Sequence, residues 1–176
     1  MIFETERLIA KPWTLQDVPH AFRMYGDPEV MRYLGQNGAA STINSLEEME
    51  ERLAKSIAKY EQSPYIYAAM HHKPSGEVVG TGLLKPLELS IGGPAEEIEI
   101  GWHLAKDYWG QGLGTEIGLA LLQHGFGTLE LKELHAIAYP QNAASLRIMQ
   151  KIGMEFQGST DRYYGVTAEH YRINRA

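Results

Sequence analysis

Hydrophobic and polar residues alternate between Glu97 and Leu104, which is the period of a β-strand with one buried face. Isoleucine, tryptophan and leucine side chains fall on one face, and glutamate, glycine and histidine on the other. Three glycines follow at alternate positions: Gly110, Gly112 and Gly114. Apolar residues then recur at helical spacing up to about Gly127. The stretch therefore predicts a strand, a glycine-rich loop and a helix in succession.

The same patterns predict the elements on either side. We expect further helices over 14–25, 28–34, 46–62 and 142–152, strands over 8–11, 65–72, 77–84, 134–139, 154–157 and 163–173, and loops over 35–45 and 87–95. An antiparallel meander thus precedes two strand–helix units. We find no repeat, low-complexity stretch or linker, so the sequence predicts one α/β (α+β) domain over residues 1–176.

The glycine loop has the geometry of an anion-binding site, because backbone N–H groups and the positive end of a helix dipole would point to one place. A simple strand-to-helix turn needs one glycine, so three favour phosphate binding. A Walker loop is excluded because Gly114 is followed by Thr115 and Glu116 rather than Lys-Ser or Lys-Thr. A dinucleotide fingerprint is excluded because the spacing is G-x-G-x-G and the next strand ends in Tyr139-Pro140 rather than an acid.

Several motifs together resemble one family. Trp109-Gly110-Gln111-Gly112-Leu113-Gly114 resembles the pyrophosphate loop of the GNAT superfamily of acetyl-CoA-dependent N-acetyltransferases. Asn142-Ala143-Ala144-Ser145, followed by Lys151-Ile152-Gly153-Met154, is similar to the next helix of that family. The opening Glu4-Thr5-Glu6-Arg7-Leu8 and the start of the loop resemble the RimJ/RimL group, which acetylates ribosomal-protein N-termini. The resemblance covers nearly the whole chain.

The resemblance implies a GNAT fold, with a central mixed, mostly antiparallel twisted sheet of about six to seven strands flanked by about four helices. Two residues depart from the family pattern. Trp109 stands where Arg or Gln is usual, although Trp is common in the RimJ/RimL group. Met149 stands where many members carry the tyrosine that protonates the leaving thiolate. A thiolate is a fair leaving group without that proton, since its pKa is near 8.5.

The family further implies how acetyl-CoA, the co-substrate, is held. Backbone N–H groups of the loop would bind the diphosphate, and the pantetheine arm would pair along His103 and Leu104 like an extra strand. The Leu104 N–H would donate to the thioester oxygen and stabilise it as it becomes anionic. Asn142 would bond the arm while also capping its helix. The predicted cofactor-binding residues are His103, Leu104, Trp109, Gly110, Gln111, Gly112, Leu113, Gly114, Thr115, Asn142 and Ser145.

The predicted catalytic residues are Glu99, Glu97, Ser145 and Leu104. Family members often keep a glutamate on this strand that relays a proton through water, and we assign the general base to Glu99 with Glu97 as the second choice. At both positions a solvent-facing strand residue is an equal alternative. The Ser145 hydroxyl suits a hydrogen bond to the cofactor better than proton donation. The chain has no cysteine, which removes the best covalent nucleophile and favours direct attack by the amine.

The composition of the chain limits the classes of binding partner that we expect. A net charge of −6 argues against nucleic-acid binding and mildly favours a cationic amine acceptor. The histidine spacings predict no metal site. No apolar run reaches the roughly 20 residues of a membrane span, and the N-terminus lacks a signal-peptide core, so we expect a cytoplasmic protein without a membrane partner. A homodimer is left open.

These inferences lead to one functional hypothesis and two alternatives. The leading hypothesis is an acyltransferase that moves an acetyl group from acetyl-CoA to a primary amine, the α-amine of a protein N-terminus of the ribosomal-protein type. The first alternative is a small-molecule N-acetyltransferase acting on an antibiotic, a polyamine or an amino acid. The second is a non-catalytic acyl-CoA-binding module, to which the absent tyrosine gives some weight. The sequence does not identify the acceptor.

Overall fold

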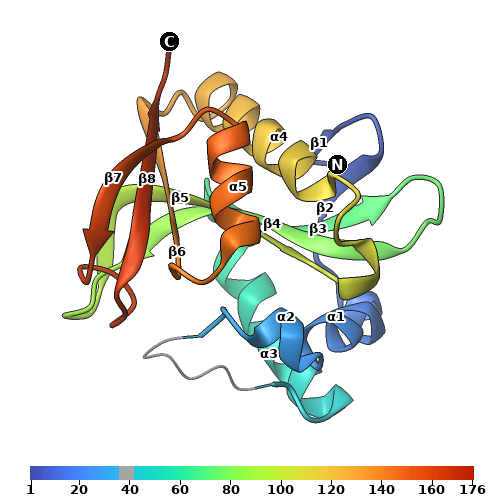
Figure 1. Ribbon diagram of the computed structural model, residues 1–176. Coiled ribbons are helices and arrows are strands. Elements are labelled where there is room, and N and C mark those ends of the chain that lie inside the picture. Colours follow the sequence, from blue (N-terminus) through green and yellow to red (C-terminus); the bar gives the residue numbers. More distant parts are fainter. Residues whose placement is uncertain (36–41) are drawn as a thin grey trace.

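The computed structural model describes residues 1–35 and 42–176. Within them eight strands form one sheet in the order β1-β2-β3-β4-β5-β6-β8-β7 (Figure 1). The strands are β1 (Phe3–Glu4), β2 (Leu8–Pro12), β3 (Ile66–His72), β4 (Val78–Glu88), β5 (Pro94–Leu104), β6 (Glu133–Ala138), β7 (Glu155–Thr160) and β8 (Ala168–Asn174). Neighbouring strands are antiparallel except for β5 and β6, which run parallel.

Helices cover both faces of this sheet (Figure 1). They are α1 (Val18–Tyr25), α2 (Pro28–Met31), α3 (Leu46–Tyr60), α4 (Leu113–Gly127) and α5 (Ala143–Lys151), with short 3₁₀ turns at Leu15–Asp17 and Lys106–Tyr108. Strand β3 illustrates the two resulting cores, because its successive side chains point to opposite faces. Ala68 and Met70 join the core under α4 and α5, whereas Ala69 joins the core under α1, α2 and α3.

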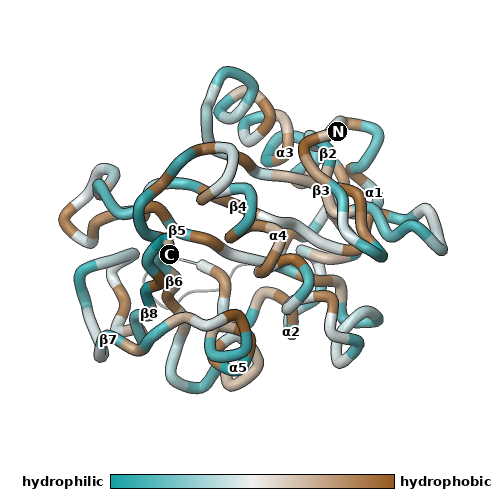
Figure 2. The backbone as a smooth tube through the Cα atoms, turned by 90° about the horizontal axis from the view of Figure 1, so that it is seen from above, coloured by the Kyte–Doolittle hydropathy of each residue, from teal (hydrophilic) through white to brown (hydrophobic). Residues whose placement is uncertain are grey.

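Helix α4 is apolar on most sides because it is enclosed by the sheet and by α5. In Figure 2 it carries mainly hydrophobic colour, while β8 and several outer connections are hydrophilic. Its glycines allow the close packing. A Cβ on Gly114 would lie 2.6 Å from Ile148 Cδ1 of α5, and a Cβ on Gly125 would lie 2.7 Å from Leu134 Cδ1 of β6. A larger residue at either position would require the Ile148 or Leu134 side chain to move out of its packed position.

The structure confirms the predicted mixed, mostly antiparallel sheet and the strand–loop–helix unit, with α4 running from Leu113 to Gly127. The strand count is higher than the predicted six to seven, because the two-residue strand β1 is too short to show alternation. The predicted loop over 87–95 was too long, since β4 reaches Glu88 and β5 begins at Pro94. Most of the predicted loop over 35–45 lies outside the described residues.

Two further boundaries differ from prediction. The helix predicted over 28–34 ends at Met31, and the strand predicted over 163–173 begins only at Ala168. In the second case the residues before Ala168 form a connection that contacts the tip of β4 and β5 instead of pairing with β7. No helix among the described residues is long and apolar enough to cross a membrane.

Candidate active site

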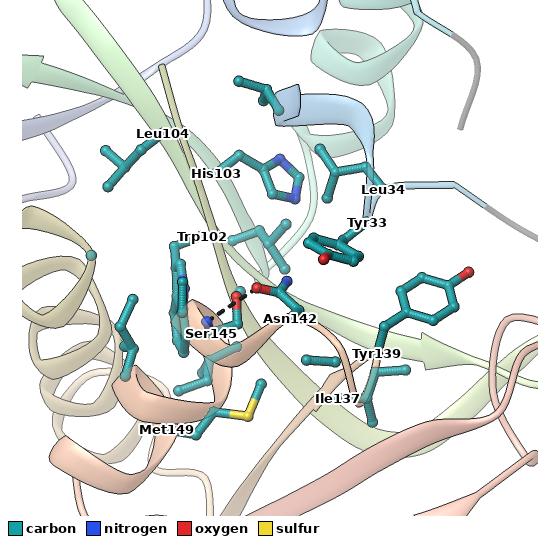
Figure 3. A pocket seen from close by; sticks show the side chains of 18 of the residues that line it. Tyr33, Leu34, Trp102, His103, Leu104, Ile137, Tyr139, Asn142, Ser145 and Met149 are labelled. Carbon is teal, nitrogen blue, oxygen red and sulfur yellow. Dashed lines mark hydrogen bonds between the residues drawn. The ribbon is translucent and has the colours of Figure 1, made fainter. Parts of the chain in front are cut away.

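A cavity of about 860 Å³ opens where β5 and β6 diverge. The parallel ladder between these strands has one registered pair, Glu99 with His135, so β5 continues toward Leu104 without β6 beside it. The start of α4 and the first turns of α5 line one part of the cavity, and residues of α2, α3, β4 and the β7–β8 connection line the rest. Figure 3 shows this pocket with Trp102, His103 and Leu104 across from Asn142 and Ser145.

The last residues of β5 present an open backbone edge to the cavity. Ala105 N donates to Val79 O of β4 at 2.9 Å, and N–H groups alternate in direction along an antiparallel ladder. The N–H groups of Trp102 and Leu104 therefore point away from β4, toward the gap left by β6. The Leu104 carbonyl accepts from the Trp109 indole Nε1 at 2.8 Å, which fixes Trp109 to the strand. The two N–H groups are available to a strand-like ligand.

The glycine loop and the first turn of α4 meet this edge. Gly110 and Gly112 have φ values of 73° and 79°, a conformation that other residues adopt at a cost, and Gly112 is the N-cap of α4. The N–H groups of the first turn, from Leu113 to Thr115, have no intrahelical partner. Together with the helix dipole, these N–H groups can hold an anion at the cavity. The third glycine, Gly114, is explained by packing against α5.

A polar brace behind the loop joins it to the N-terminal segment. The Arg7 guanidinium donates to Gln111 O at 2.8 Å and to Glu116 Oε2 at 2.7 Å, and the Thr5 hydroxyl donates to Glu116 Oε1 at 2.5 Å. Burial raises the pKa of Glu116, but the hydrogen bonds from Thr5 and Arg7 outweigh it, and the pKa lies below its ordinary value. The Glu4–Leu8 motif, to which the sequence assigned no role, thus holds the loop and α4 in place.

On the opposite wall, Asn142 is the N-cap of α5, and its Oδ1 accepts from Ser145 N at 3.2 Å. The Ser145 side chain lines the cavity, as does the buried Met149 one turn further along the helix. Figure 3 shows Asn142 and Ser145 facing β5. The capping role is present, and the Asn142 amide and Ser145 hydroxyl remain exposed to the cavity for a ligand.

Glu99 lines the cavity, but its carboxylate is already bound to two neighbouring side chains. Tyr164 of the β7–β8 connection donates to Glu99 Oε2 at 2.6 Å, and Lys85 Nζ lies 3.2 Å from the same oxygen and also contacts the Tyr164 hydroxyl. Burial and the charge of Glu99 raise the pKa of Tyr164 well above its ordinary value. Tyr164 has a φ of 57°, which is rare for a bulky residue and common at functional sites. The three side chains form a neutral cluster.

Two predicted site residues do not line the cavity. Glu97 is paired with Arg162, whose Nη1 lies 2.6 Å from Glu97 Oε1. Gln111 turns its side chain back to Asp107 O at 2.9 Å, so its backbone, and not its amide, is near the loop surface. All the other predicted residues line the cavity: Glu99, His103, Leu104, Trp109, Gly110, Gly112, Leu113, Gly114, Thr115, Asn142 and Ser145.

The His103 side chain has surroundings that the sequence did not predict. Its Nδ1 lies 3.0 Å from the hydroxyl of Tyr25, the last residue of α1, and the two rings meet edge to face. The same hydroxyl lies 2.8 Å from Thr81 Oγ1 and 3.0 Å from the Tyr67 hydroxyl. Burial, helped by the positive charges of Lys85 and Arg52, lowers the pKa of His103 to about 4. The imidazole is therefore neutral at physiological pH.

Tyr25, Lys85 and Tyr164 are the cavity-associated residues that sequence reasoning missed. They lie far apart in the chain, and none belongs to a local motif. Among the residues that the structure describes, no group of three or more His, Asp and Glu side chains could hold a metal ion.

Comparisons with known proteins agree with this geometry. The chain is 26% identical over 173 residues to the uncharacterized N-acetyltransferase YoaA of Bacillus subtilis, covering 98% of this chain and 93% of that protein. A crystal structure of a GNAT-family acetyltransferase from Bacillus anthracis superposes with a TM-score of 0.78 at 21% identity, covering 97% of this chain and 96% of that one. RimL, a ribosomal L7/L12 α-N-protein acetyltransferase solved with coenzyme A, gives 0.76 at 15% identity, covering 98% and 97%.

The family assignment rests on a match that extends over most of the chain. The model of the acetyltransferase (GNAT) domain matches residues 7–155, which include the open edge of β5, the glycine loop and α5. The chain belongs to the GNAT family of acetyltransferases and is an N-acetyltransferase.

Proposed function

We propose that this protein transfers the acetyl group of acetyl-CoA to the α-amine of a protein N-terminus by direct attack. The observation that carries the proposal is the meeting of an open strand edge with a phosphate-binding helix start in one cavity. The diphosphate of CoA would bind at the N–H groups of the α4 first turn. The pantetheine arm would pair with Trp102 and Leu104, so that the Leu104 N–H donates to the thioester oxygen.

Asn142 and Ser145 would contact the arm from α5. Ser145 lines the cavity, and among the residues that the structure describes its hydroxyl makes no hydrogen bond to a histidine or carboxylate that could activate it as a nucleophile. Direct attack without an acetyl-enzyme is therefore the simpler course. The missing tyrosine at Met149 does not prevent it, since a thiolate leaves readily.

The proposed class of acceptor rests on the charges around Glu99 and His103, which we call the acceptor side of the cavity. A lysine or polyamine amine has a pKa near 10.4 and needs a strong base, whereas an α-amine has a pKa near 8 and needs little help. Glu99, the carboxylate in the cavity that we predicted as base, is neutralised by Lys85. Arg52 also lines the cavity, on the side of His103, and its positive charge would repel a polycation. Both features favour an α-amine over a polyamine.

The proposal is tested by measuring thiol release from acetyl-CoA against matched acceptors. Short peptides with a free α-amine and no lysine should be acetylated, while the same peptides with a blocked N-terminus and one lysine should not. Polyamines and aminoglycosides complete the panel. Acetylation of small amines alone would favour the small-molecule alternative, and CoA binding without turnover on any acceptor would favour the binding module.

A further inference from the structure

We propose that His103 is the residue that accepts the proton released by the attacking amine, and that Tyr25 holds it in position. This inference rests on the proposed function and names a residue other than the predicted Glu99 for the proton transfer. It is carried by the position of His103 on β5, by the fixed partner of its Nδ1 and by the pairing of Glu99.

His103 lies next to the atom that would hold the reacting carbonyl. It immediately precedes Leu104, whose N–H faces the gap beside β6. Successive side chains on a strand point to opposite faces, so His103 projects to the face of α1–α3, whereas Leu104 projects to the face of α4 and α5. Figure 3 shows the His103 ring extending from β5 into the pocket, toward Leu34 and Tyr33.

Glu99 is too distant for direct contact with the same carbonyl. It precedes Leu104 by five residues on a continuous strand. At the usual rise per residue this separates their backbones by about 16 Å, more than a glutamate side chain spans. Its carboxylate is also held by Lys85 and Tyr164, and protonating it would break that cluster.

The hydroxyl of Tyr25 determines which nitrogen of His103 is free. Burial raises the pKa of Tyr25 well above 10, so the phenol keeps its proton. Its oxygen has one proton and two lone pairs to share among Thr81, Tyr67 and His103 Nδ1. We assign the tyrosine proton to Thr81, which leaves a lone pair for Nδ1–H. The Nε2 lone pair of His103 is then directed to the cavity.

The proton transfer balances with groups already named. The amine lone pair attacks the thioester carbon, the C–N bond forms, and the carbonyl electron pair moves to the oxygen bound by Leu104 N–H. One proton of the now cationic nitrogen passes to His103 Nε2. The oxyanion then collapses, the C–S bond breaks, and the CoA thiolate leaves and takes up that proton from the imidazolium directly or through water.

A weak base is sufficient for this step. Burial lowers the pKa of His103 to about 4, so it cannot deprotonate a free ammonium ion, and the acceptor has to arrive as a neutral amine. Once the C–N bond forms, however, the nitrogen carries a positive charge beside an oxyanion and is a much stronger acid. The groups that face His103 are Tyr25 on α1, Arg52 on α3, Thr81 and Lys85 on β4, and none is an anion that would raise its basicity.

The first test compares His103→Asn with Glu99→Gln. Asparagine places an amide near the position of Nδ1 and keeps a partner for Tyr25, but removes Nε2. His103→Asn should lower kcat by roughly 10²- to 10⁴-fold while leaving the thermal shift with CoA unchanged. Glu99→Gln should have the smaller effect on kcat. If His103→Asn keeps a kcat within threefold of the wild type, the proposal is wrong.

The second test asks whether the His103 imidazole acts as a base or only fills space in the cavity. His103→Ala leaves space for a five-membered ring, so its activity is measured with added imidazole and with pyrazole, which has the same size but is much less basic. Recovery with imidazole and not with pyrazole supports the proposal. Equal recovery with both, or with neither, contradicts it. A wild-type protein that acetylates no amine would instead contradict the proposed function, which keeps the two failures distinct.

Discussion

The two sides of the cavity are made from different kinds of groups. The side where we propose that CoA binds, called the cofactor side below, consists mostly of backbone N–H groups from β5, the glycine loop and the first turn of α4, all within one continuous stretch. The acceptor side consists of side chains, and Tyr25, Lys85 and Tyr164 come from α1, β4 and the β7–β8 connection. A backbone site depends on local conformation, whereas a side-chain site depends on how distant elements pack.

The difference predicts that one glycine controls cofactor binding. Gly112→Val should abolish it, because a side chain at a φ of 79° distorts the loop where the diphosphate approaches. CoA at about 100 times its dissociation constant should stabilise the wild type by roughly 2.7 kcal/mol, and the variant should show no such shift.

The matched control is Gly76→Val. Gly76 has a φ of 73° and open space around it, but it lies in the turn between β3 and β4 and does not line the cavity. It should carry a similar backbone strain and still bind CoA. Loss of CoA binding in both variants would mean that strain, and not the site, is responsible.

This contrast also explains how much the sequence predicted. The strand, loop and α4 follow from alternation, glycine spacing and helical periodicity over some thirty residues, so the elements on this side of the cavity were predicted nearly in full. The partners of Glu99 and His103 were not, since pairing with Tyr164 or Tyr25 requires contacts across 65 and 78 residues that no local pattern encodes. The two-residue strand β1 was missed for the opposite reason, because it is too short to have a period.

On the acceptor side, Tyr164→Phe should reduce activity toward the amine acceptor and leave CoA binding unchanged. The change removes the hydroxyl that donates to Glu99, a hydrogen bond to a charged group worth about 1.5 kcal/mol or more. We expect kcat/KM for the amine to fall roughly tenfold, with the CoA thermal shift unchanged. A reduced CoA shift would show that the two sides are not separable.

The brace behind the loop is the exception, because it supports the cofactor side through side chains. Glu116→Gln should lower the free energy of unfolding by about 1.5 kcal/mol at neutral pH. The folded-state pKa of Glu116 is lowered from 4.5, so this stabilisation is complete above pH 4.5 and is lost as the pH falls through the lowered value.

Denaturant unfolding of wild type and Glu116→Gln from pH 7 to pH 3 checks this prediction. The difference between the two proteins should narrow below pH 4.5. If the difference in unfolding free energy stays constant over the whole pH range, the charge of the Glu116 carboxylate is not its cause.

The smallest effect is expected for Ser145→Ala. The Ser145 N–H bond to Asn142 is a backbone contact, so the variant keeps its helix cap and loses only a hydroxyl in the cavity. Activity should fall by a few-fold, the loss of about one neutral hydrogen bond. Initial rates over both substrates should give intersecting double-reciprocal lines in both proteins. Parallel lines, or an acetylated protein when acceptor is withheld, would indicate a covalent route and make Ser145 its first candidate.

The β7–β8 connection has a consequence for the order of folding. It reaches the β4–β5 tip through the Leu89–Tyr163 bridge, and Ser90 of that tip donates to Asp161 O and accepts from Gly165 N. With the bond from Tyr164 to Glu99 of β5, these hydrogen bonds span 65 to 75 residues. Closing so long a loop costs chain entropy before any contact is gained, and such contacts slow folding. The strand, loop and helix of the stretch from Glu97 to Gly127 form from neighbouring residues, and only the brace from Thr5 and Arg7 joins this stretch to a distant segment. The β7–β8 connection is therefore the last part of the cavity lining to form and the first to open, and amide hydrogen exchange should be faster in residues 161–166 than in α4.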